Sequence, residues 1–239
     1  MLVQQSKMAA MGEMIDNIAH QWKQPLGVIS MLNGLVKLSN EHSGVNKKDE
    51  IISESVENIE HEVKHLTSTI NDFRNFFSPN KERKEFFIED SIERLFRLLN
   101  PRLKNENIEI IKNIDSLKIE SIENELVQVL MNVVNNAIDA VAESKVDKKY
   151  IFVDAYEEKN NLVISIKDNG GGIPLEIGNK IFESRFTTKE EGKGTGIGLY
   201  MSRQVMSSLN GTLTVENSDY EFEEKSYRGA NFIISIPKS

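Results

Sequence analysis

Two stretches in the first third of the chain repeat apolar residues at alternating steps of three and four. This spacing places the apolar side chains along one seam of an α-helix. The polar residues 40–46, which include Gly44, separate the stretches and predict a turn. We therefore predict an all-α antiparallel helical hairpin over residues 1–78. The seam positions are Met8, Met11, Ile15, Ile18, Trp22, Pro25, Ile29, Leu32 and Val36, followed by Ile52, Val56, Ile59, Val63, Leu66, Ile70, Phe73 and Phe77.

Two helices alone bury little apolar surface. We therefore expect the hairpins of two chains to pair into a four-helix bundle, which makes the protein a homodimer. In this register His20 lies two residues after one seam position and two before the next, so it is predicted to point outward.

After the hairpin, short runs of β-branched residues alternate with helical periodicity. Residues 79–84 include Pro79 and a charged run, which predict a linker. Several of the strands that follow are adjacent and read as hairpins, so we predict an α+β domain over residues 85–239, with an antiparallel or mixed sheet covered by helices on one face. The predicted helices are 90–103, 122–143 and one that continues to about 209, and the predicted strands are 85–88, 108–111, 118–120, 150–155, 162–167, 212–216 and 230–236.

Composition excludes several kinds of site. The 239 residues carry a net charge of −8, so no basic face is available for non-specific binding of nucleic acid. The absence of cysteine excludes disulfides and thiolate metal sites. No apolar run approaches the ~20 residues that a membrane-spanning helix needs, and we expect a soluble, cytoplasmic segment without membrane contact.

One predicted helix carries two aligned amides. Asn132 and Asn136 are four residues apart and therefore share a helix face. Because asparagine is unfavourable inside a helix, two aligned amides suggest carbonyl ligands for Mg²⁺ or donors to phosphate. The alternative is a polar outer face on a helix whose other side belongs to the core.

A glycine run follows the predicted strand 162–167. Asp168 and Asn169 precede three consecutive glycines, which allow a positive φ and a close approach of a ligand to the backbone. The carboxylate of Asp168 can accept a hydrogen bond from an exocyclic amine, which favours adenine over guanine. An Asp-Asn-Gly sequence is ordinarily a simple turn, although three glycines make that interpretation less adequate.

A second glycine-rich segment, residues 191–200, opens a helix. Its free N–H groups and the helix dipole predict an anion site. The spacing matches neither a dinucleotide-binding fingerprint nor a P-loop. The preceding residues 182–193 are polar and carry two phenylalanines, which is typical of a mobile lid, and Lys189 within it is placed to reach a terminal phosphate.

His20 and Pro25 lie close together inside the first predicted helix. A proline within a helix costs roughly 3 kcal/mol, so a local reason is expected. The simplest interpretation of this stretch alone is a kinked surface helix with an incidental histidine.

Taken together, these motifs resemble the GHKL (Bergerat) ATP-binding fold. Asn136, the Asp168 loop, the lid and residues 194–199 occur in the order of its N, G1, F and G2 boxes. The segment from Ala19 to Leu26 is similar to the H box of sensor histidine kinases. The resemblance covers nearly the whole chain and implies a kinase core made of a phosphoacceptor hairpin and a GHKL domain.

The resemblance also assigns roles. It implies that His20 is phosphorylated from ATP and passes the phosphoryl group to an aspartate on the receiver domain of a response regulator. Asp168 would bind the adenine amine, and Asn136 would ligate Mg²⁺ with assistance from Asn132. The remaining implied site residues are Gln21 and Gln24 beside the histidine, and Gly170, Gly172, Thr188, Lys189, Gly194, Thr195, Gly196, Gly198 and Leu199 around the nucleotide.

Gln21 departs from the family pattern. Members usually follow the histidine with a Glu or Asp that orients the ring and takes its proton. Gln21 can orient the ring but cannot accept the proton, so we expect slow autophosphorylation. This keeps open an ATP-binding scaffold, or a response-regulator phosphatase with weak kinase activity. Because Met1 falls almost directly on the first helix, we expect a sensor portion elsewhere in the whole protein.

Overall fold

The computed structural model describes residues 22–23, 25–40, 48–77, 82–178, 180–188 and 196–238, with backbone alone at 48, 50, 65 and 68–77. These residues fall into two compact units. A helical unit ends at Asn75, and an α/β unit begins at Phe76.

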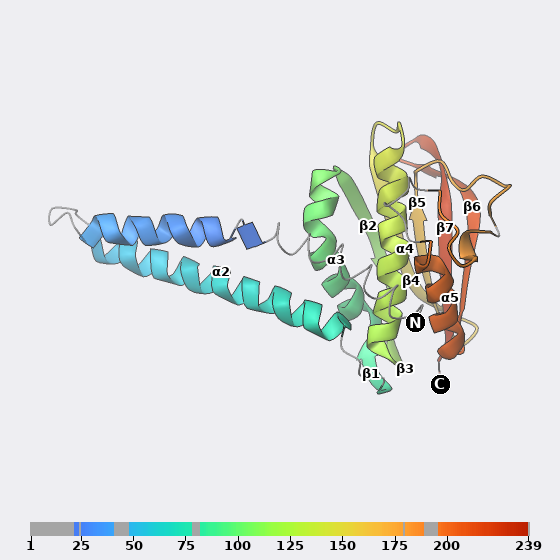
Figure 1. The fold of residues 1–239 in the computed structure, drawn as a ribbon, viewed down its shortest axis with the longest axis horizontal. Coiled ribbons are helices and arrows are strands. Elements are labelled where there is room, and N and C mark those ends of the chain that lie inside the picture. The colour runs from blue at the N-terminus through green and yellow to red at the C-terminus, as the bar shows by residue number, and fades with distance from the viewer. Residues whose placement is uncertain are drawn as a thin grey trace. The chain divides into compact units, whose positions relative to one another are not determined.

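The helical unit is the predicted hairpin. Residues 25–40 form one helix, and α2 (Lys48–Phe77) forms the other. The two helices lie side by side within their unit (Figure 1). Pro25 and Leu32 are buried, while Ile29 and Val36 are half-buried, as the seam predicts.

Two predicted seam positions of α2 are exposed in the single chain. Ser55 is buried, whereas Val56 and Val63 are 46% and 47% exposed. A helix with 3.6 residues per turn lets Ile52, Ser55 and Ile59 follow one face as readily as the predicted set does. The small serine side chain occupies little space between the two helices, so the valines face outward.

Every helix and strand predicted after residue 85 is present in the α/β unit. Their bounds differ from the predicted ones by a few residues, except at the last two strands, which are much longer. The elements are β1 (Lys84–Phe87), α3 (Ile88–Asn105), β2 (Ile108–Ile114), β3 (Lys118–Ser121), α4 (Glu123–Glu143), β4 (Lys149–Glu158), β5 (Asn161–Asp168), the 3₁₀ turn η1 (Lys180–Phe182), α5 (Gly198–Ser208), β6 (Thr212–Phe222) and β7 (Lys225–Pro237).

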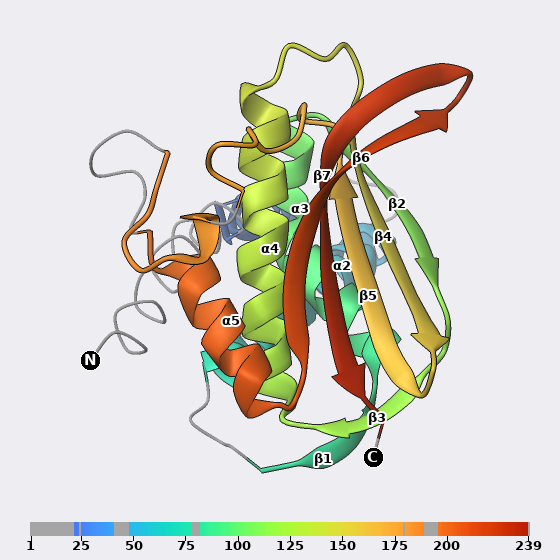
Figure 2. The ribbon, with the colours of Figure 1, turned by 90° about the vertical axis from the view of Figure 1, so that its right-hand side faces the viewer.

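The main sheet is mixed, as predicted. Its strand order is β2-β4-β5-β7-β6. Strand β2 runs parallel to β4, and the other neighbours are antiparallel. Helices α3, α4 and α5 cover one face of this sheet (Figure 2). The core lies between the two layers, where Leu126, Val133 and Ile138 of α4 and Ile151 and Ile164 of the sheet are almost completely buried.

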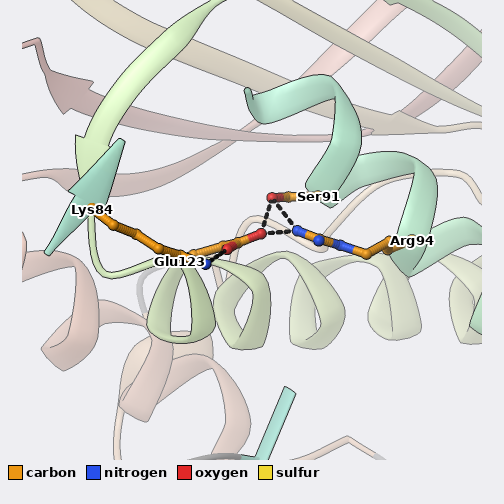
Figure 3. A network of polar contacts seen from close by, with 4 residues as sticks. All are labelled: Lys84, Ser91, Arg94 and Glu123. Atoms are coloured by element: carbon orange, nitrogen blue, oxygen red, sulfur yellow. Dashed lines mark hydrogen bonds and ion pairs between the residues drawn. The ribbon is translucent and has the colours of Figure 1, made fainter. Parts of the chain in front are cut away.

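A polar network joins the start of this unit to α4. Strand β1 pairs with β3 in a separate two-stranded sheet. Glu123, at the first turn of α4, is only 6% exposed. Its carboxylate lies 2.5 Å from Lys84 Nζ of β1 and contacts the guanidinium of Arg94 on α3 (Figure 3). The Ser91 hydroxyl donates to the same carboxylate at 2.8 Å. A buried carboxylate needs such partners, so the network ties β1, α3 and α4 together.

Strands β6 and β7 extend beyond the rest of the sheet. Strand β5 pairs with β7 only from Asn231 onward, while the β6–β7 ladder continues to Phe222 and Lys225. The turn between them consists of Glu223 and Glu224, whose φ angles are 48° and 61°. No glycine or asparagine marks this turn, so the sequence pattern placed the end of β6 several residues too early and the start of β7 several residues too late.

Candidate functional site

Asp168 ends β5 and is 1% exposed. Its carboxylate accepts hydrogen bonds from the N–H groups of Gly170 at 2.8 Å and Ala230 at 3.3 Å. Burial raises the pKa of this carboxyl from 3.8 to about 6, and the two N–H donors offset part of that rise. A buried carboxylate with few donors is well suited to bind a ligand amine, because the amine supplies the missing hydrogen bond.

Asn169, the residue after Asp168, anchors the loop that follows β5. Asn169 is buried, accepts a hydrogen bond from the Tyr150 N–H at 2.9 Å and donates to the Lys148 carbonyl at 2.7 Å. Both partners belong to the start of β4 or the residue before it. The Asp-Asn pair is therefore part of a structured loop and not a simple surface turn.

The glycines of this loop allow close packing on two sides. A Cβ at Gly170 would lie 2.8 Å from the backbone of Ala140 on α4. Gly172 has a φ of 83°, and a Cβ there would lie 2.6 Å from the amide oxygen of Asn217. These packing requirements add a second reason for both glycines, besides the entry of adenine that the resemblance implies.

One face of α4 connects the loop to α5. Asn132 donates from its amide to the Ser202 hydroxyl at 3.0 Å and to the Gly198 carbonyl at 3.4 Å. Ala140, two turns later on the same face, contacts Gly170. Asn136 lies between them and is half-buried. The predicted alignment of Asn132 and Asn136 therefore places Asn136 between the glycine loop and the first turn of α5.

Asn136 fits a magnesium ligand. Its carbonyl oxygen is the hard donor that Mg²⁺ prefers. The neighbouring Asn132 uses its amide nitrogen to hold the start of α5, so its contribution in this structure is to position that helix.

The first part of the predicted lid contacts Gly196, which follows the lid in the sequence. The Arg185 N–H donates to the Gly196 carbonyl at 2.8 Å. Gly196 has a φ of 61°, and a Cβ there would lie 2.7 Å from the Phe186 carbonyl oxygen. Phe182 packs against the Arg203 guanidinium of α5, 4.9 Å from its ring centroid.

The remaining predicted residues divide between described and undescribed parts of the chain. Gly198 and Leu199 form the first turn of α5, and Thr188 is exposed at the end of the described lid segment. The other predictions lie outside the described residues, namely His20, Gln21, Gln24, Lys189, Gly194 and Thr195.

Three groups around this site were missed by sequence reasoning. Arg102 of α3 donates to Asn135 of α4 at 2.8 Å and contacts the Asp139 carboxylate. Asn217 and Tyr220 of β6 bind the loop that follows β5. Their partners are 33 to 52 residues away in the chain, and no local pattern indicates such pairs.

Comparison with known families agrees with this architecture. Residues 121–239 match the model of the histidine kinase-, DNA gyrase B- and HSP90-like ATPases. Residues 10–82 match the His kinase A (phospho-acceptor) domain. The chain belongs to the sensor histidine kinases. Its fold is therefore a helical phosphoacceptor hairpin followed by an α+β sandwich of the GHKL type.

Other sensor kinases align with the chain over most of its length. The two-component sensor PprA of Pseudomonas aeruginosa is 29% identical over 99% of this chain, which spans 25% of that protein. The sensor protein DegM of Bacillus sp. is 29% identical over 99% of this chain and 57% of its own length. The chain thus spans less than two thirds of these relatives.

Solved histidine kinase structures share the fold. The catalytic domain of histidine kinase ThkA is 30% identical, with a TM-score of 0.55, over 66% of this chain and 98% of that domain. ThkA in complex with the response regulator protein TrrA is 23% identical, with a TM-score of 0.53, over 98% of this chain and 64% of that one. None of the helices among the described residues is long and apolar enough to cross a bilayer.

Proposed function

We propose that this sensor histidine kinase core transfers the γ-phosphoryl group of Mg-ATP to His20 and then to an aspartate on a response regulator. The observation that supports this most is the face of α4 that joins the Asp168 loop to the first turn of α5. An adenine amine, a metal ion and a phosphate chain each meet a suitable group along that face.

The proposed roles follow from the chemistry of each residue. Asp168 accepts a hydrogen bond from the adenine amine, and Asn136 would ligate Mg²⁺, which when bound would supply charge neutralisation for the phosphates. The first turn of α5 presents unpaired N–H groups to those phosphates at Gly198 and Leu199. The roles of Thr188 and Lys189 in the lid, and of Gly194 and Thr195 after it, rest on the family resemblance alone.

Phosphorylation of His20 requires positioning more than covalent chemistry by the ATP-binding domain. A neutral imidazole nitrogen attacks the γ-phosphorus, a P–N bond forms, and the bond to the β,γ-bridging oxygen breaks to release ADP. The ring proton then leaves to solvent, because Gln21 cannot accept it and Gln24 is likewise an amide. The aspartate of a receiver domain attacks the same phosphorus in the second step and releases the imidazole.

An exposed apolar stripe on the hairpin supports pairing of two chains. The seam inside one hairpin leaves large side chains uncovered on its outer face, and such stripes usually mark an interface. We propose that a second copy covers this stripe and completes a four-helix bundle. Its members are Leu26, Val28, Met31, Leu35, Leu38, Val56 and Val63.

Labelled ATP distinguishes the kinase from the scaffold alternative. The chain incubated with γ-labelled ATP and Mg²⁺ is expected to acquire label that acid removes and base does not. His20→Ala should reduce the label to background while leaving ATP affinity unchanged. Nucleotide binding without any label would contradict the kinase and favour an ATP-binding scaffold.

A glutamate at position 21 is expected to accelerate phosphorylation of His20. Gln21→Glu supplies a group that can take the ring proton, and general bases contribute about 10² to 10⁴ in rate. We expect at least a roughly tenfold rise in the single-turnover labelling rate, with ATP affinity unchanged. Gln5→Glu adds the same charge elsewhere in the segment and should have no effect. An unchanged or lower rate in Gln21→Glu would show that proton acceptance does not limit the reaction.

A further inference from the structure

The extended end of the β6–β7 hairpin forms hydrogen bonds with the loop that carries Asp168. We call residues 217–230 the hairpin arm. The Tyr220 hydroxyl donates to the main-chain carbonyl of Asp168 at 3.1 Å. The Asn217 amide accepts from the Ile173 N–H at 2.7 Å and donates to the Ile173 carbonyl at 2.8 Å. The arm therefore binds the loop at both of its ends.

We propose that Tyr220 and Asn217 are positioning residues that orient the Asp168 carboxylate for recognition of the adenine amine. This inference rests on the proposed function, in which Asp168 accepts a hydrogen bond from that amine. Neither residue needs to touch the nucleotide. Each acts through the backbone of the loop and thereby sets where the carboxylate points.

The surroundings of Tyr220 fix its hydroxyl. Its ring lies 4.2 Å from the Lys167 ammonium and packs edge-on against Phe152 at 5.2 Å, and Tyr227 is 5.9 Å away. Burial, with the nearby charge of Asp168, raises the pKa of Tyr220 well above its ordinary value. The hydroxyl therefore remains a donor throughout the physiological pH range, and its partner is the Asp168 carbonyl.

The loop and Asn217 fit each other closely. Gly172 has no side chain where the Asn217 amide lies, and its φ of 83° favours glycine. The Gly171 N–H donates to the Arg228 carbonyl at 3.0 Å, which adds a backbone contact between loop and arm. A loop held at Asp168, Gly171 and Ile173 has little freedom to reorient.

The tip of the arm is itself tied to β4. Glu223 accepts hydrogen bonds from Lys148 Nζ at 2.7 Å and from the Tyr150 hydroxyl at 3.1 Å. These two hydrogen bonds lower the pKa of Glu223, and the one from Lys148 contributes most. Tyr150 also packs edge-on against Phe222, at 5.1 Å between ring centroids. These contacts stabilise the left-handed turn at Glu223 and Glu224. The arm is therefore held in a defined position against β4.

The test compares ATP with purine riboside 5′-triphosphate, which lacks the exocyclic amine, on the purified chain. Wild type is expected to bind ATP at least roughly tenfold more tightly than the analogue, because a hydrogen bond to a charged group is lost. In Tyr220→Phe this preference should fall about fivefold, with affinity for the analogue within twofold of wild type. A merely structural effect would weaken both ligands equally and leave the preference unchanged.

Tyr227→Phe is the matched control. It removes a hydroxyl from the same arm, and that hydroxyl forms no hydrogen bond within the described part of the chain, so the preference should be unchanged. Asn217→Ala provides a second variant should Tyr220→Phe prove unstable, and it should reduce the preference in the same way. Melting curves of all variants establish that the chain is folded during the binding measurements.

Asp168→Asn distinguishes a failure of the adenine contact from a failure of the positioning by Tyr220 and Asn217. If it retains the preference for ATP, the proposed contact between Asp168 and adenine is wrong. If it loses the preference while Tyr220→Phe and Asn217→Ala retain it, the adenine contact stands and the positioning inference is overturned. Loss of preference in all three supports the inference.

Discussion

Asp168→Asn is expected to make the nucleotide-free chain more stable at pH 8 by about 3 kcal/mol while weakening its binding of ATP. Burial raises the pKa of Asp168 from 3.8 to about 6, so ionising this group in the folded domain costs more than in the unfolded chain. The asparagine has no charge to desolvate. It can still accept the hydrogen bonds from Gly170 and Ala230 through its amide oxygen.

The gain in stability of Asp168→Asn over wild type is expected to increase with pH. Below about pH 4 the carboxyl is protonated in both states, and wild type gains the full benefit of a neutral buried group. As the pH rises through about 6 this benefit is lost in wild type but not in Asp168→Asn. The difference in unfolding free energy between the two proteins should therefore grow between pH 4 and pH 6 and stay constant above pH 6.

Urea unfolding of the α/β unit, followed at pH 4.5, 6 and 8, checks this expectation. Asp147→Asn removes the same charge from an exposed position and is expected to be neutral. A stability difference that does not change with pH would contradict the assigned cause. ATP affinity should fall by a factor on the order of 10 to 100 in Asp168→Asn, as for the loss of a hydrogen bond to a charged group.

Gly229→Ala is expected to destabilise the α/β unit by about 3 kcal/mol or more. A Cβ at Gly229 would overlap the main-chain carbonyl of Asp168. No change of rotamer relieves an overlap between backbone atoms, so β7 and the loop must move apart, and overpacking of this kind is costly. Because that movement also breaks the contact from Ala230 to Asp168, ATP binding should weaken too.

The measurement is urea unfolding with circular dichroism, together with ATP titration of the folded protein. Gly178→Ala is the matched control, because the nearest atom outside its two adjacent residues, the Leu175 carbonyl oxygen, would lie 3.8 Å from the new Cβ. The control should change stability by less than about 0.5 kcal/mol, as for most substitutions that create no overlap. An equally small effect in Gly229→Ala would show that β7 and the Asp168 loop can separate at little cost.

Periodicity along the chain was enough to predict the elements that position the site. The apolar stripe of α4 determines which of its residues enter the core, and this leaves Asn132 and Asn136 together on another face of the helix. The strand before Asp168 and the glycines after it likewise have local patterns. Both kinds of signal depend on residues a few positions apart, so the helix, the strand and the loop were predicted within a few residues.

The hairpin arm could not be predicted in this way. Its turn at Glu223 and Glu224 uses two residues that rarely adopt positive φ, and it depends on Lys148 and Tyr150, which are 75 and 73 residues away. The polar residues after Glu216 therefore indicated the end of a strand. The side on which Val56 packs was equally undecided, because the three-four spacing fits two neighbouring helix faces.

The sequence by itself thus determined the two-part fold and the order of the motifs, because each rests on short-range periodicity or on the conformational needs of glycine. It also predicted Asp168 and Asn136 as site residues, through the resemblance to the GHKL fold. Only the tertiary structure decided that Asp168 is buried with a raised pKa, and that Tyr220, Asn217 and Gly229 surround its loop. Burial and hydrogen bonding between residues 44 to 62 positions apart are produced by chain folding, and no local pattern specifies them.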